Sequence, residues 1–180
     1  DIHTFIERAF EKYLGCGDLA KGFARVVCKS CGSNQLVAFS CKVRGLCPSC
    51  DGRRMSEQAA HLVDNVIPEV GVRQFVLTVP FWLRYKMAWD HELTGVVLRI
   101  FTATVRSWYR KRARAVGAED PRCAGVTLIQ RFGDGVRLSP HFHTLFGEGA
   151  WSKPAPDWPV AFYSVAPPSD EDVAKMVATI

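Results

Sequence analysis

Six of the seven cysteines lie between positions 16 and 50, and four of them form two Cys-x-x-Cys pairs, Cys28 with Cys31 and Cys47 with Cys50. Chance gives about 0.3 such pairs in a chain with this cysteine content, so two pairs indicate a four-thiolate zinc site on two tight turns. A filled site of this kind has no position for a substrate, so we expect the Zn²⁺ to be structural. Redox disulfides or unrelated core cysteines are the alternative interpretation.

A fifth thiol, Cys41, lies between the two pairs, so the sequence leaves open which four of the five bind zinc. Cys16 and Cys123 stand apart from the pairs, and we expect both to be small buried hydrophobic residues. Basic side chains flank the pairs and are candidate DNA contacts, with a solvated surface as the alternative. These residues are Lys42, Arg44, Arg53 and Arg54.

A second candidate metal site is formed by His141 and His143, which point to the same face if their segment is a β-strand. Two imidazoles on one face can chelate a metal ion, although structural histidines give the same pattern. Gln130, on the preceding predicted strand, is a candidate third ligand. Two neutral rings and one amide suit a Mg²⁺ or Mn²⁺ ion that also holds a phosphate oxygen.

Positive charge is concentrated in the middle of the chain. Residues 71–117 carry nine basic and two acidic side chains, whereas residues 118–180 carry five and eight. Such a segment is typical of a surface that binds a polyanion, most often nucleic acid, and a solvated helix face is the alternative. The candidate DNA contacts here are Arg110, Lys111, Arg112 and Arg114.

The elements that position these residues follow from hydrophobic periodicity. Amphipathic spacing predicts helices over residues 2–14 and 52–67, with a short strand over 35–40 between them and a domain boundary near 68–72. Beyond that boundary we expect an aromatic connector after the first strand, and a helix that begins at the N-cap Asp90. The further predicted elements are strands over 72–79, 125–132 and 141–146, the helix over 90–117 and a last helix after Ser169.

This order predicts an α+β protein in which a small zinc-ribbon-like or knuckle-like domain, residues 1–70, precedes an antiparallel sheet with helices on one face, residues 71–180. The most apolar stretch is broken by charges and prolines, so it falls short of the roughly 20 residues of a membrane helix. We therefore expect a soluble protein in a reducing compartment, the cytoplasm.

The ordered motifs together resemble the rolling-circle insertion-sequence transposases of the HUH superfamily, which carry an N-terminal zinc-binding domain. The motifs are Cys28-x-x-Cys31-Gly32, Ser40-Cys41-Lys42-x-Arg44-Gly45-x-Cys47-Pro48-x-Cys50-x-x-Arg53-Arg54-Met55, Leu83-Arg84-Tyr85, Gln130-Arg131-Phe132-Gly133 and His141-Phe142-His143. The resemblance implies a bacterial, nucleoid-associated protein of DNA transposition. It also implies a tyrosine that nicks single-stranded or hairpin element ends, with His141, His143 and Gln130 as metal ligands.

The nucleophilic tyrosine of that family lies well downstream of the histidine pair. Tyr13, Tyr85, Tyr109 and Tyr163 do not match its position, and we expect Tyr85 and Tyr109 to be packing residues. The chain is therefore expected to be a transposase fragment, inactive alone, with its nucleophile beyond Ile180. The alternatives are a non-catalytic, zinc-dependent DNA-binding module or transposase remnant, and a metal-dependent hydrolase that acts on something other than DNA.

Overall fold

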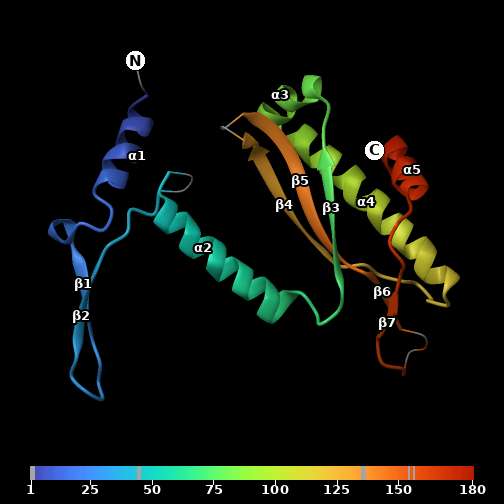
Figure 1. Ribbon diagram of the computed structural model, residues 1–180, viewed down its shortest axis with the longest axis horizontal. Coiled ribbons are helices and arrows are strands. Elements are labelled where there is room, and N and C mark those ends of the chain that lie inside the picture. The colour runs from blue at the N-terminus through green and yellow to red at the C-terminus, as the bar shows by residue number, and fades with distance from the viewer. Residues whose placement is uncertain (1–2, 44–45, 135–136, 154, 156) are drawn as a thin grey trace. The chain divides into compact units, whose positions relative to one another are not determined.

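The computed structural model describes residues 3–43, 46–134, 137–153, 155 and 157–180 (Figure 1). The chain divides into two compact units, Asp1–Ile67 and Pro68–Ile180. Among the described residues, no helix has both the length and the apolar character that crossing a membrane requires.

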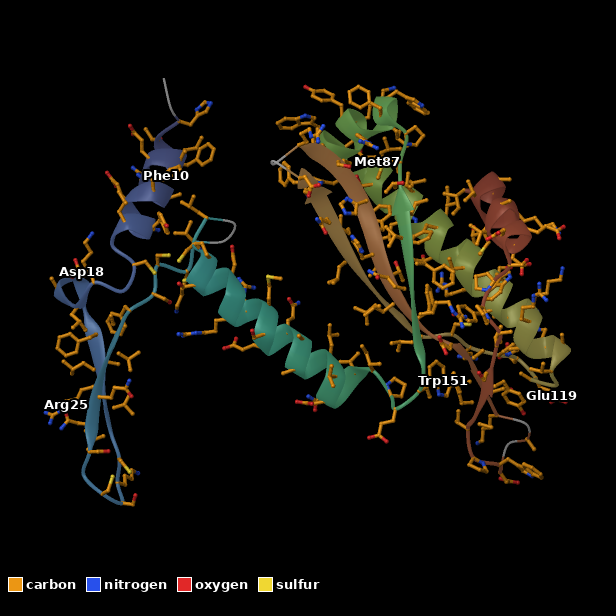
Figure 2. All side chains as sticks on the ribbon, viewed as in Figure 1. Phe10, Asp18, Arg25, Met87, Glu119 and Trp151 are labelled. Atoms are coloured by element: carbon orange, nitrogen blue, oxygen red, sulfur yellow. The ribbon has the colours of Figure 1, made fainter. Side chains whose placement is uncertain are left out.

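The first unit is built from small elements with little apolar burial. Helix α1 (Thr4–Leu14) leads through a short 3₁₀ turn, Leu19–Lys21, into strands β1 (Phe23–Val27) and β2 (Asn34–Ala38). Helix α2 (Pro48–His61) follows and continues as a π-helical turn, Leu62–Val66. Cys47 is the single buried residue among those described in this unit, and Figure 2 shows Phe10 and Arg25 projecting away from α1 and β1. The described part of this unit therefore has no apolar core of its own.

Strands β1 and β2 form an antiparallel hairpin whose register runs from Phe23 opposite Ala38 to Val27 opposite Asn34. Gly32 in the hairpin turn has φ of +71°, a conformation that favours glycine. Sequence periodicity predicted only the second of these strands. Every residue of β1 is exposed, so the strand lacks the alternation that marks a half-buried one.

The second unit has a three-stranded antiparallel sheet in the order β3 (Val72–Thr78), β5 (Leu138–Gly147), β4 (Gly125–Phe132). Helix α4 (His91–Ala115) covers one face of this sheet (Figure 1). Phe101, Tyr109 and Phe142 lie at the centre of the buried cluster between them. An antiparallel sheet with a helix on one face is therefore present, as predicted.

Helix α4 forms where its local signals place it. The Asp90 side chain accepts a hydrogen bond from the Leu93 backbone N–H at 2.9 Å, and the buried residues recur every four positions from Phe101 to Ala113. Gly117, with φ of +97°, follows the last turn. Helix α5 (Asp170–Thr179) begins with a capping box between Ser169 and Asp172.

Three elements of this unit were not predicted. The aromatic connector is helix α3 (Phe81–Trp89), and the short strands β6 (Gly149–Ser152) and β7 (Ala161–Ser164) pair antiparallel. Hydrophobic periodicity does not predict helix α3, because aromatic residues also occupy its exposed side. Strands of four residues are too short to display an alternating pattern.

Candidate functional site

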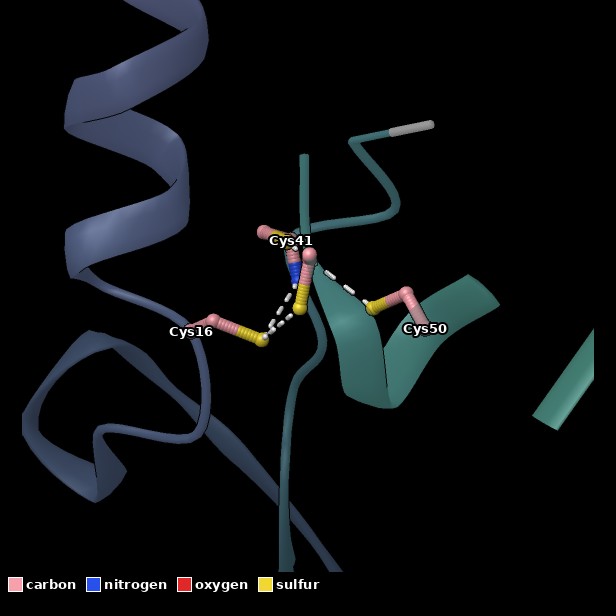
Figure 3. Close-up of side chains that lie close together, drawn as sticks. Cys16, Cys41 and Cys50 are labelled. Carbon is pink, nitrogen blue, oxygen red and sulfur yellow. Dashed lines mark hydrogen bonds between the residues drawn. The ribbon is translucent and has the colours of Figure 1, made fainter. Parts of the chain in front are cut away.

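Four cysteine side chains converge in the first unit. The sulfur atoms of Cys16, Cys41, Cys47 and Cys50 all lie within 4.8 Å of one another (Figure 3). The Cys16 and Cys47 sulfurs are 3.6 Å apart, and those of Cys41 and Cys50 are 3.8 Å apart. A zinc ion bound by four thiolates at about 2.3 Å needs sulfurs separated by about 3.8 Å. The donor set and its spacing therefore fit a structural Zn²⁺.

Each sulfur is positioned by the end of an element. Cys16 follows the last turn of α1, where its backbone N–H bonds to the Tyr13 carbonyl at 2.9 Å. Cys41 follows β2, and its N–H donates to the Cys16 sulfur at 3.4 Å. Cys47 is the N-cap of α2 and Cys50 lies in its first turn. The positive end of the helix dipole favours thiolates at these two positions.

The cluster changes the acidity of Cys41. A hydrogen bond from the Val43 backbone lowers the pKa of Cys41, but desolvation and the neighbouring thiols outweigh it and raise that pKa to about 12. Without a metal ion, the Cys41 thiol is therefore protonated at neutral pH. Metal binding has to displace this proton, so the affinity for Zn²⁺ must rise with pH.

The structure corrects the predicted ligand set. It brings Cys41, Cys47 and Cys50 together, but it places Cys28 and Cys31 in the turn of the β1–β2 hairpin, outside the cluster. There the Cys28 sulfur contacts the Ser30 hydroxyl at 3.0 Å, and Cys31 donates to Ser33 at 3.2 Å. Cys16, expected to be a small buried hydrophobic residue, takes part in the cluster instead.

The physical reason is the path of the chain. The two strands carry the first Cys-x-x-Cys pair along the hairpin, whereas Gly15 turns the chain after α1 and brings Cys16 to the start of α2. The second pair lies on a helical turn rather than a knuckle turn, because Pro48 at the first helical position starts α2 earlier than predicted. In the sequence, the signal that Cys16 belongs to the cluster was its position directly after Gly15, the residue that ends α1.

A hollow of about 500 Å³ lies beside the cysteine cluster. Its lining includes Cys16 and Cys50 and three of the candidate DNA contacts, Lys42, Arg53 and Arg54. The fourth, Arg44, lies outside the described residues. Basic side chains from the segment before α2 and from α2 itself therefore line one concave surface beside the cluster.

The second unit places its two histidines on one face of the central strand. Phe142, between them, is fully buried against α4, so His141 and His143 point to the opposite side of the sheet. Their ring centroids are 4.9 Å apart. Gln130 is the register partner of His141 on β4 and shares its face. The three predicted metal ligands therefore lie on one face of the sheet.

Hydrogen bonds orient these side chains. His141 Nδ1 lies 2.5 Å from the Ser139 carbonyl oxygen, which fixes the proton on Nδ1 and leaves Nε2 with a free lone pair. His143 Nδ1 lies 2.8 Å from the Gln74 amide, a neighbour that sequence reasoning missed. Gln130 donates through Nε2 to the Phe132 carbonyl at 3.0 Å, so its amide oxygen is left to accept or ligate.

A basic groove of about 850 Å³ runs along α4. Arg106, Arg110, Lys111 and Arg114 line it from the helix, and Arg122 lines it from the facing segment. Asp120 in the groove pairs with Arg110 at 3.3 Å and with Arg122 at 3.4 Å. Five cations against one carboxylate leave the groove strongly positive, which suits a phosphate backbone. Cys123, expected to be a buried hydrophobic residue, is part-buried in this groove, where burial raises its pKa.

Arg112, a predicted DNA contact, forms an ion pair with a residue of α5. Its Nη2 atom donates to both carboxylate oxygens of Asp172 at 2.8 Å, which ties α4 to α5. Its guanidinium also lies 5.9 Å from the Trp108 ring centroid. A rotation of about 100° per helical residue turns Arg112 away from Arg110 and Arg114, so its side chain lies toward α5 rather than in the basic groove.

Two tyrosines of this unit have different environments. Tyr109 is fully buried and accepts a hydrogen bond from Arg73 at 3.0 Å, and burial raises its pKa. Tyr85, expected to be a packing residue, is 68% exposed on α3.

The four-cysteine cluster at the start of a mixed α/β chain fits a zinc-binding domain. Residues 1–79 match the family described as transposase zinc-binding domain. This match supports a transposase with a structural Zn²⁺, and it indicates a role in transposition with DNA as the partner. Neither the curated proteins nor the solved structures include a match to the chain.

Proposed function

We propose that this chain is part of a transposase that nicks single-stranded DNA at the ends of a mobile element and transfers the cut strand. The support for this proposal is the face of β5 on which His141, His143 and Gln130 converge, in the same chain as a transposase zinc-binding domain. In this proposal residues 1–70 hold the element DNA, and residues 71–180 form the metal-binding part of an HUH-type sheet. The natural setting is then the nucleoid in the bacterial cytoplasm.

We assign His141, His143 and Gln130 as ligands of a Mg²⁺ or Mn²⁺ ion. When bound, such an ion withdraws charge from a non-bridging phosphate oxygen. His141 already presents Nε2, because Nδ1 is held by the Ser139 carbonyl. For His143 to do the same, the Gln74 amide has to present its oxygen to Nδ1, and rotation of that amide by about 180° achieves this.

In the proposed reaction, a tyrosine oxygen forms a bond to phosphorus and the bond from phosphorus to the 3′ oxygen breaks. The tyrosine loses its proton, the departing oxygen gains one, and the products are a 5′-phosphotyrosine link and a free 3′-hydroxyl. Tyr109 is excluded as the attacking group because it is buried and bonded to Arg73. In this proposal the nucleophile is a tyrosine of another segment of the transposase, because none of Tyr13, Tyr85, Tyr109 and Tyr163 stands at the position that the family resemblance implies.

The proposed DNA contacts are the hollow beside the cysteine cluster and the basic groove on α4. Lys42, Arg53 and Arg54 line the first, and Arg110, Lys111 and Arg114 line the second. Clustered cations on these surfaces suit contacts with the phosphate backbone, which position a nucleic acid without reading its sequence. Single-stranded or hairpin ends are the proposed ligands.

A Mn²⁺ titration monitored by electron paramagnetic resonance tests the metal assignment. The parent chain should bind one Mn²⁺, and the His141→Ala plus His143→Ala double variant should bind none at the same concentrations while it keeps its zinc. His91→Ala is the matched control, because His91 lies on α4 and contacts Arg131 instead. Equal Mn²⁺ binding by the double variant would refute the assignment.

A non-catalytic, zinc-dependent DNA-binding module is the second candidate, favoured by the burial of Tyr109. It predicts that extending the natural reading frame past Ile180 reveals no tyrosine-bearing helix. It also predicts that the double histidine variant binds DNA as the parent does, in the presence or absence of Mn²⁺.

A further inference from the structure

An aromatic groove of about 770 Å³ lies in the second unit, apart from the basic groove on α4. Helix α3 contributes Phe81, Trp82, Arg84 and Tyr85 to its lining. Arg137, from the connection between β4 and β5, and Ser139, at the start of β5, also line it.

The aromatic side chains on this helix face outward. Phe81 is 83% exposed, and Trp82 and Tyr85 are each 68% exposed. Leu83 and Met87 of the same helix already pack into the core, so the outward rings are not needed to hold α3 in place. A water-exposed helix face usually carries polar side chains, and a cluster of exposed aromatic rings marks a binding surface.

Cations accompany these rings. Arg84 and Lys86 are the charged residues of α3, and Arg137 lies across the groove together with the carboxylate of Asp134. Arg84 is held in place because its Nε donates to the Val79 carbonyl at 3.0 Å. Flat rings with positive side chains beside them suit a ligand that is both planar and anionic.

The groove adjoins the histidine face. Strand β3 ends at Thr78, the register partner of His141, and α3 begins at Phe81. Ser139 lines the groove, and its carbonyl oxygen holds His141 Nδ1. A ligand in the groove would therefore extend toward the two imidazoles.

We propose that this groove binds an unpaired nucleobase of single-stranded DNA by stacking on Trp82 and Tyr85, so that a neighbouring phosphate reaches the histidine face. The inference rests on the proposed function. It adds a site that would distinguish single-stranded from duplex DNA, because the ring faces of bases in a duplex are covered by the neighbouring bases. Two copies of the chain packed groove to groove would bring their Arg84 and Arg137 side chains together, and this repulsion disfavours a self-interface.

Two labelled probes test the stacking, an oligothymidine and an abasic oligomer of the same length with intact phosphodiesters. Trp82→Ala and Tyr85→Ala should each weaken oligothymidine binding by about tenfold in fluorescence anisotropy, with an unchanged salt dependence, because stacking releases no counterions. Binding of the abasic oligomer should stay at the parent level. Trp82→Phe should restore most of the affinity because it keeps a stacking ring.

Trp158→Ala is the matched control, since Trp158 is 63% exposed but lies outside the groove. Circular dichroism verifies that each variant is folded. Parent-level oligothymidine binding by both alanine variants would overturn the inference, as would an equal loss on the abasic oligomer. A dimeric parent that Trp82→Ala converts to a monomer would also overturn it, in favour of an interface between copies. A parent that binds neither probe would instead overturn the proposed function.

Discussion

The sulfur of Cys16 lies 3.6 Å from the sulfur of Cys47, although 31 positions separate the two residues. This contact joins the end of α1 to the start of α2 in a unit where Cys47 is the single buried residue among those described. Because apolar burial is so small there, a bound Zn²⁺ has to supply much of the free energy that holds these elements together.

The revised ligand set predicts which cysteines zinc needs. Cys16→Ser should lower zinc affinity by at least about 100-fold and reduce the helical signal of the first unit, because a ligand of the metal is lost. Cys28→Ser is the matched control and should keep one zinc per chain. Elemental analysis and circular dichroism measure the two effects. Loss of zinc from Cys28→Ser but not from Cys16→Ser would contradict the revised set and support the ligands expected from Cys-x-x-Cys spacing.

The hairpin turn predicts a reactive thiol. Hydrogen bonding by the Ser30 hydroxyl, with the backbone N–H groups of Cys31 and Ser30, lowers the pKa of Cys28 to about 6. Cys28 is therefore mostly thiolate at neutral pH, and iodoacetamide should modify it first in the zinc-loaded protein. Its rate should fall as the pH drops through about 6.

Mass spectrometry of digested samples follows this labelling residue by residue. Cys123 serves as the internal comparison, because burial raises its pKa and should make it slow to react. Protection of Cys28 by added zinc would show that the hairpin thiols also bind the metal, contrary to this prediction.

The link between α4 and α5 predicts a dependence of stability on pH. Hydrogen bonds from Arg112 lower the pKa of Asp172 to about 2, below the ~3.9 of an unfolded chain. A lowered carboxyl pKa stabilises the folded state above the unfolded value, and this contribution is lost as the pH falls from about 4 toward about 2.

Asp172→Asn should therefore lower the urea midpoint at neutral pH and flatten its decline in this acidic range. Glu171→Gln is the neighbouring control, because Glu171 forms an exposed pair with Lys175, and such pairs contribute little to stability. An unchanged acid profile in Asp172→Asn would argue against the link between the two helices.

The basic groove predicts a salt effect on DNA binding. Lys111→Ala and Arg114→Ala should each weaken binding to any sequence and reduce the log–log salt slope by about 1, because each removes one phosphate contact. Arg99→Ala is the control on the same helix, since Arg99 is exposed and lies outside the groove. Slopes equal to that of the parent would remove α4 from the DNA interface.

Local signals in the sequence were enough for several features. The Asp90 N-cap and the apolar spacing specified α4, because both act within a few residues of the chain. The common face of His141 and His143 followed from the two-residue period of a strand, and the turn between β4 and β5 brought Gln130 beside them. These features need no knowledge of distant contacts.

Other features depend on where distant segments meet. Cys28 and Cys31 have the same local spacing as Cys47 and Cys50, yet the length of the hairpin decides which pair joins the cluster. Arg112 pairs with Asp172 because α5 packs on that side of α4. Spacing along the chain fixes the direction of a side chain relative to its own element, whereas the packing of elements fixes what that side chain meets.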